Sequence, residues 1–201
     1  MKEKIKAVIF DWGGVLIEDP APGLVQYCAL ALNVPKERYE KAYRKFSEDF
    51  QKNLISEDTF WERISSELKV HKPIAPSLWA EAFQAAYVPR KKMFTLAAEL
   101  KAKGYKTVVL SNTEFPAMQY FYLLGYDMFD VAVFSCTEGT IKPERQIFEI
   151  ALAKLGCTPE QSVFIDDYQE FIEAAKEYGL HAILFESIEK ISYKLAEIGV
   201  K

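Results

Sequence analysis

The sequence predicts an α/β fold with a mostly parallel sheet and an all-helical segment inserted into it. From about residue 91 onward, stretches with the 3.6-residue period of helices alternate with short apolar runs typical of buried strands, and glycines follow the helices. Between about residues 18 and 90 the strand signal disappears, and the chain becomes helical and rich in aromatic residues. The alternation of helices and strands after residue 91 is typical of a parallel sheet with crossover helices.

The first expected strand is the hydrophobic run from Ala7 to Phe10, which stops abruptly at Asp11. Later strands are expected at residues 106–110, 131–134, 162–165 and 182–185, and helices at 93–102, 116–124, 144–155, 170–178 and 188–198. We therefore assign residues 1–17 and 91–201 to a core domain. Residues 18–90 are assigned to a helical cap subdomain, because segments containing proline flank them.

Aromatic residues of the insertion recur at helical spacing at Tyr39, Tyr43, Phe46 and Phe50. Ser56 precedes two acidic residues, which predicts the beginning of a helix there. We interpret the aromatic residues as the packing residues of a small bundle. A role for one or two of them in lining a substrate site stays open, since the sequence does not indicate which face they share with it.

Composition narrows the functional classes. The 201 residues carry a net charge of −4 with acidic and basic residues mixed throughout, which argues against nucleic acid and membrane partners and favours a small molecule. No apolar run is long enough to span a bilayer or to serve as a signal-peptide core. Three scattered cysteines are typical of free thiols in a reducing compartment, which predicts a cytoplasmic protein. Two isolated histidines argue against a zinc centre or a Ser-His-Asp triad.

Polar residues follow three of the predicted strands: Asp11 the first, the pair Ser111-Asn112 the second, and the pair Asp166-Asp167 the strand that begins at residue 162. Lys142 precedes a helix after a short loop. Each residue alone has an ordinary explanation as a turn residue, a helix cap or a solvated lysine. Because the carboxyl ends of parallel strands meet at one edge of a sheet, we expect these residues to form one site.

Such a set suits the hydrolysis of a phosphate monoester. Crowded carboxylates repel one another, and Mg²⁺, which prefers oxygen ligands, relieves that repulsion when Asp11, Asp166 and Asp167 bind it. Lys142 would neutralise charge on the phosphoryl group, while the Ser111 hydroxyl and nearby backbone N–H groups hold its oxygens. Asp11 would act as the nucleophile and form an aspartyl-phosphate that water then cleaves.

Over nearly its whole length the chain resembles the haloacid dehalogenase-like superfamily of hydrolases. Four segments in the order and spacing of that family carry the resemblance: residues 8–16 (VIFDWGGVL), 109–113 (VLSNT), 141–144 (IKPE) and 164–167 (FIDD). The insertion resembles the helical cap of the subfamily whose cap lies between the first and second motifs.

The resemblance implies a Rossmann-like core with Mg²⁺ as cofactor, and usually phosphatase activity on a small phosphorylated metabolite. It implies that Asp11, the backbone carbonyl of Gly13 and the pair Asp166-Asp167 bind the metal. It also implies that the cap closes over the site. We assign phosphate binding to Ser111, Asn112 and Lys142, with Lys142 also balancing charge.

One departure from the family pattern bears on the substrate. Most family phosphatases carry a second aspartate two residues after the nucleophile, where this chain has Gly13. That acid protonates the leaving oxygen, and such a group contributes about 10²-fold to 10⁴-fold in rate. The chain is similar to the branch that contains α-glucose-1-phosphate phosphatases, which also carry glycine there. We therefore expect a sugar phosphorylated at its anomeric carbon, whose leaving oxygen is more acidic than an ordinary alcohol.

Two other functions stay open. A 2-haloacid dehalogenase would use the same nucleophile without a metal, but dehalogenases of this family generally lack the acidic pair found at Asp166-Asp167. The third possibility is a phosphate-binding or protein-binding module with little turnover, because Tyr168 and Phe171 replace the serine and asparagine common in the family; we interpret both as core packing. Glu18 and Asp19 could replace the missing acid, although we interpret them as solvated hinge charges.

Overall fold

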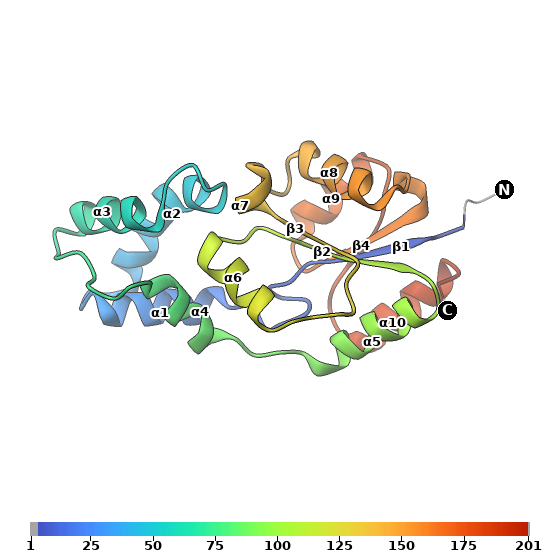
Figure 1. Cartoon of the computed structure of the whole chain (residues 1–201), viewed down its shortest axis with the longest axis horizontal. Helices are drawn as coiled ribbons and strands as arrows, with labels where there is room; N and C mark the ends of the chain where they lie inside the picture. Colours follow the sequence, from blue (N-terminus) through green and yellow to red (C-terminus); the bar gives the residue numbers. More distant parts are fainter. Residues whose placement is uncertain (1–3, 201) are drawn as a thin grey trace.

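The computed structural model describes residues 4–200, so the first three residues and the last residue of the predicted core lie outside it. Five strands form one parallel sheet in the order β3-β2-β1-β4-β5. Their bounds are β1 (Ala7–Phe10), β2 (Lys106–Ser111), β3 (Val131–Phe134), β4 (Ser162–Asp166) and β5 (His181–Leu184). Helices cover both faces of the sheet (Figure 1), which confirms the predicted α/β, Rossmann-like fold.

The central strand β1 is buried on both faces, which explains its uninterrupted apolar run. Ala7 and Ile9 belong to the hydrophobic cluster on the face covered by α8 (Arg145–Leu155) and α9 (Gln169–Glu177). Val8 and Phe10 belong to the cluster that includes α5 (Lys91–Ala102) and α10 (Ile188–Glu197). Successive residues of a strand point to opposite faces, so four residues serve two cores.

Strand register brings the predicted site residues to one level. Phe10 pairs with Val109 of β2 and with Ile165 of β4, and the Asp11 N–H donates to the Ile165 carbonyl at 2.9 Å. From β1 the chain places β2 and β3 on one side and β4 and β5 on the other. Ligands of open parallel sheets bind at such a point of reversal, outside the carboxyl ends of the strands.

Four helices lie between β1 and α5 in the chain and gather beyond the carboxyl ends of the strands (Figure 1); we call them the cap. They are α1 (Ala21–Ala31), α2 (Lys36–Gln51), α3 (Glu57–Leu68) and α4 (Leu78–Ala86). Ser56 caps α3 as predicted, accepting a hydrogen bond from the Thr59 N–H at 3.1 Å. The two segments that connect the core to the cap lie next to each other, since the Glu18 N–H donates to the Val88 carbonyl at 2.8 Å. The predicted boundaries of a separate subdomain stay a prediction.

The segment between β3 and α8 differs from the prediction. A short loop was expected to lead to Lys142, but residues Ser135–Glu138 form a helical turn, α7, that ends at Gly139. A four-residue helix is too short to show a helical period in the sequence. A 3₁₀ turn, η1 (Pro159–Gln161), also precedes β4, and α6 (Phe115–Leu123) follows β2. Within residues 4–200, none of the helices combines the length and apolar character needed to cross a bilayer.

Candidate active site

Three carboxylates meet at the carboxyl ends of the central strands. Asp11 follows β1, Asp166 is the last residue of β4, and Asp167 comes directly after it. One carboxylate oxygen from each lies within 4.8 Å of the others. Asp11 and Asp166 are buried, with 6% and 0% of their surface exposed. The parallel sheet therefore brings Asp11 next to an acidic pair that begins 155 residues later in the chain.

Lys142 supplies a positive charge between two of these acids. Its ammonium lies 2.8 Å from Asp11 Oδ1 and 2.6 Å from Asp166 Oδ2, and its side chain is 1% exposed. Burial lowers the pKa of the Lys142 ammonium, but attraction to Asp11 and Asp166 outweighs this effect and raises the pKa above its ordinary value. The lysine is therefore charged, and one cation faces three carboxyl groups.

The lysine does not fully offset the repulsion among the three carboxylates. Burial raises the pKa of Asp11, and the charges of Asp166 and Asp167 raise it further against the effect of Lys142. Burial and the charge of Asp166 raise the pKa of Asp167 to about 6. Asp167 Oδ1 is buried and has no hydrogen-bond partner within residues 4–200. An unpartnered oxygen among crowded carboxylates fits a divalent cation that takes oxygen ligands.

Gly14 lets the first motif approach Asp167. Its φ of +86° is favourable only for glycine, and a Cβ at this position would collide with the Asp167 carboxylate. At Gly13 a Cβ would lie 3.1 Å from Pro20 Cδ. The ring of Pro20 therefore crowds this position, and a side chain there would require the ring to shift by a few tenths of an ångström.

Asn112 and Ser111 occupy different positions from those expected of a matched phosphate-binding pair. The Asn112 amide donates to the Lys142 carbonyl at 2.9 Å and accepts from the Lys142 N–H at 2.8 Å, so its side chain positions the lysine segment. Ser111 Oγ accepts from the Thr113 hydroxyl at 2.8 Å and borders the pocket, which leaves its own hydrogen for a ligand. The assignment of phosphate binding to Ser111 and Asn112 stays a prediction.

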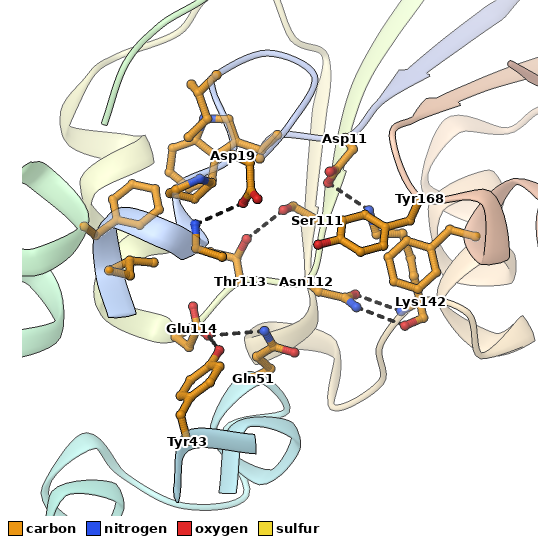
Figure 2. A pocket seen from close by; sticks show the side chains of 18 residues that line it. Asp11, Asp19, Tyr43, Gln51, Ser111, Asn112, Thr113, Glu114, Lys142 and Tyr168 are labelled. Carbon is orange, nitrogen blue, oxygen red and sulfur yellow. Dashed lines mark hydrogen bonds and ion pairs between the residues drawn. The ribbon is translucent and has the colours of Figure 1, made fainter. Parts of the chain in front are cut away.

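A cavity of about 290 Å³ opens between these residues and the cap. Figure 2 shows Asp11, Ser111 and Tyr168 on one side of it and Tyr43, Gln51 and Glu114 on the other. The apolar part of its lining consists of Trp12, Ile17, Pro20, Ala21, Leu24, Phe83 and Phe171. No sequence pattern indicates Gln51, while Tyr43 is one of several aromatic residues that recur at helical spacing in the cap.

The interpretation of Tyr168 as core packing is wrong, because the residue is 51% exposed and its ring borders the cavity. Phe171 is partly buried and packs against the hydrophobic cluster of β1 and α8, as expected for core packing, and it also borders the cavity. The Lys142 ammonium lies 5.1 Å from its ring centroid, and aromatic faces attract cations. Tyr168 thus contributes to the site, and Phe171 to both the site and the core.

The two hinge acids are exposed, as expected for solvated charges. Glu18 forms an ion pair with Arg90 at 2.9 Å, which links the two segments that connect the core to the cap. Asp19 borders the cavity and accepts a hydrogen bond from the Ala21 N–H at 2.9 Å. Glu18 is therefore directed to the hinge, and Asp19 to the mouth of the site.

Comparison with known proteins identifies the family. The model of the haloacid dehalogenase-like hydrolases matches residues 5–179. Acyl-CoA dehydrogenase family member 10 of Mus musculus is 32% identical over 189 residues, a match that covers 89% of this chain but only 18% of that protein. A sesquiterpene phosphatase of Aspergillus oryzae is 25% identical over 182 residues, and the match covers 87% of this chain and 87% of that protein.

A solved structure shares the fold. The HAD family enzyme bt-2542 of Bacteroides thetaiotaomicron superposes with a TM-score of 0.82 at 21% sequence identity, covering 96% of this chain and 99% of that one. The same enzyme has been crystallised with magnesium and inorganic phosphate. The motifs, the topology and the family match agree, and this chain belongs to the haloacid dehalogenase-like hydrolases.

Proposed function

We propose that the protein is a Mg²⁺-dependent phosphatase that hydrolyses a small sugar phosphate. One observation carries the proposal: Asp11, Asp166 and Asp167 converge within 4.8 Å around a buried lysine at the end of a parallel sheet. Related proteins support it, since a fungal relative is a phosphatase and a structural neighbour binds magnesium and phosphate. A cavity of about 290 Å³ suits a small ester better than a polymer.

Asp11 is the nucleophile of the proposed reaction. Its carboxylate oxygen attacks phosphorus and the bond from phosphorus to the leaving oxygen breaks, so the leaving group departs as an anion and takes its proton from water. Water then attacks the phosphorus of the aspartyl-phosphate, which releases inorganic phosphate and restores the carboxylate. Lys142 holds the attacking carboxylate by its ion pair at 2.8 Å and balances charge on the phosphoryl group, with the Ser111 hydroxyl as a donor to its oxygens.

Asp11, the Gly13 carbonyl, Asp166 and Asp167 would hold the Mg²⁺ ion. When bound, the ion neutralises the acids and the phosphoryl oxygens. In the same scheme residues 1–17 and 91–201 form the catalytic core. Residues 18–90 form a cap that excludes water from the site when it closes.

Gly13 indicates which kind of leaving group the enzyme can release. No side-chain acid stands there to protonate the leaving oxygen, and Pro20 crowds the position where one would begin. An anomeric oxygen is more acidic than an ordinary alcohol, so a sugar 1-phosphate needs that acid least. We therefore expect hexose 1-phosphates to be better substrates than hexose 6-phosphates.

A panel of phosphate esters with and without Mg²⁺ tests the proposal, with Asp11→Asn as the blank. We expect Mg²⁺-dependent phosphate release, higher kcat/KM for hexose 1-phosphates, and none with Asp11→Asn. A clear preference for 6-phosphates would contradict the substrate class. Halide release from a 2-haloacid in the presence of chelator would favour a dehalogenase, and folded protein that binds phosphate analogues without turnover would favour a binding module.

A further inference from the structure

Glu114 is a buried acid at the end of the cavity that faces the cap. It precedes α6, a position where acidic side chains often cap the helix, but its side chain makes no capping bond there. Only 5% of its surface is exposed. Its carboxylate is therefore turned away from the helix end and toward the cap (Figure 2).

Three neutral groups of the cap donate to this carboxylate. The Tyr43 hydroxyl and Gln51 Nε2 each lie 3.2 Å from Oε1, and Trp79 Nε1 lies 3.2 Å from Oε2. Hydrogen bonds to ionised groups are usually about 2.7–2.9 Å long, so these three are loose. A carboxylate accepts about four hydrogen bonds, which leaves capacity for a donor from a ligand.

No cation balances the charge of Glu114. None of the ion pairs formed among residues 4–200 includes it. Burial raises the pKa of this carboxyl against the opposing effect of its donors. Burying an unpaired charge is costly, and a neutral side chain would link the cap to the core at lower cost. The acid is better explained by a group that binds beside it.

Glu114 also lies within reach of a substrate on Asp11. Tyr43, Gln51 and Glu114 line the same cavity as Asp11 and Lys142, opposite them in Figure 2. Glu114 is three residues from Ser111, so their Cα atoms are at most about 11 Å apart. A six-carbon sugar phosphate has its hydroxyl groups within such a distance of its phosphorus.

We propose that Glu114 is a specificity-determining residue that accepts a hydrogen bond from a hydroxyl of the leaving group, so that the enzyme selects phosphate esters of sugars and other polyols. This inference rests on the phosphatase function proposed above. Tyr43 and Gln51 hold the acceptor in place by their hydrogen bonds to Oε1. Esters without a hydroxyl in that position leave the buried acid without its ligand.

A deoxy series tests the inference. A hexose 1-phosphate and its analogues lacking one hydroxyl at a time are compared by kcat/KM with the wild-type protein. We expect one analogue to fall by about tenfold or more, as for a lost hydrogen bond to a charged group. In Glu114→Gln the same deoxygenation should cost less than about threefold, while the penalties for the other positions stay. Tyr43→Phe, which keeps the acid and removes one cap donor, should retain the large penalty.

Several results would overturn the inference. A flat deoxy series in the wild-type protein contradicts it, and this measurement needs no variant, so a failure of Glu114→Gln to fold does not protect the idea. If deoxygenation lowered kcat/KM as much in Glu114→Gln as in the wild-type protein, Glu114 would be a structural link only. The same would follow if Glu114→Gln and Tyr43→Phe each lost kcat/KM equally on every analogue. In these cases Mg²⁺-dependent hydrolysis of p-nitrophenyl phosphate by the wild-type protein would keep the proposed function intact. Absence of hydrolysis of every ester would overturn both proposals.

Discussion

Gly14 sets the position of Asp167 by direct contact. A methyl group at Gly14 would collide with the Asp167 carboxylate, in a backbone conformation with φ of +86°. We predict that Gly14→Ala displaces the carboxylate and raises the Mg²⁺ concentration needed for half-maximal activity by tenfold or more, since misplaced ligands weaken metal binding on the order of 10-fold to 100-fold. Mg²⁺ titration of phosphate release checks this.

Gly104→Ala is the matched control for this change. Gly104 has a φ of +88°, and a Cβ there would meet nothing within 4 Å. Its substitution imposes the same backbone strain, about 1–2 kcal/mol, without touching the site. The control should therefore lower the melting temperature but leave the Mg²⁺ requirement unchanged. An equal change in Mg²⁺ requirement in both variants would assign the effect to strain alone.

Gly13 cannot simply be converted to the aspartate of other family phosphatases. A Cβ at Gly13 would lie 3.1 Å from Pro20 Cδ, and crowding of this kind costs about 1–3 kcal/mol. We predict that Gly13→Asp has no higher kcat on a hexose 6-phosphate than the wild-type protein. Adding Pro20→Ala should raise the kcat of Gly13→Asp, because it removes the obstructing ring. A gain from the single substitution would show that the missing acid, and not the space, limits the rate.

At the scale of the elements, the segment that carries Lys142 is held by Asn112, which directly follows β2. Asn112 forms two hydrogen bonds with the Lys142 main chain, at 2.9 and 2.8 Å. We predict that Asn112→Ala lowers the free energy of unfolding by about 2 kcal/mol, about 1 kcal/mol per bond. It should also reduce kcat by tenfold or more, because the ammonium moves from Asp11. Denaturant unfolding and steady-state kinetics measure the two effects.

Thr137→Val is a control for that prediction. Thr137 belongs to α7, close in the chain to Lys142, and its hydroxyl is 2.9 Å from the Phe134 carbonyl and 2.9 Å from Glu138 Oε1. The variant should lose about 1 kcal/mol of stability and keep its kcat. If Asn112→Ala likewise kept its kcat, Asn112 would be a structural residue only.

The elements themselves were largely predictable because their sequence signals are local. The first strand was predicted at its observed bounds, since β1 is buried on both faces and reads as one apolar run. The bounds of β4 differ by one residue because Asp166, a charged residue, belongs to the strand. The turn α7 was missed, as four residues show no period.

The site was predictable only in part, because contacts with the cap depend on packing. The acids follow strand ends, whose convergence a parallel sheet guarantees, and Lys142 reaches them from the segment after α7. Gln51 lies at the last residue of α2 and reaches the cavity only through the way the cap packs on the core. Likewise, an aromatic residue after an acidic pair gives no sign of its exposure, which is why Tyr168 was placed in the interior.

At the scale of the whole molecule, folding forces like charges together. The acids lie on segments joined only through the sheet, and Lys142 is the one cation that the described ion pairs bring to them. Without a metal, the folded state therefore favours protonation of Asp11 and Asp167 more than the unfolded chain does, because their pKa values are raised. The stability of the protein is thus linked to both pH and Mg²⁺.

Stabilisation of the protein by Mg²⁺ should depend on pH. Folding raises the pKa of Asp167 from 3.8 to about 6, so between these values the folded protein binds more protons than the unfolded chain. Without metal, the contribution of Asp167 to stability is then fully present below pH about 4 and is lost as pH rises through about 6. Mg²⁺ binds the deprotonated acids, so it should raise the melting temperature strongly at pH 7.5 and little at pH 5. Asp167→Asn should abolish most of the shift, whereas Glu149→Gln, which changes an exposed ion pair with Arg145, should keep it. Equal shifts at both pH values would show that Mg²⁺ acts elsewhere on the molecule.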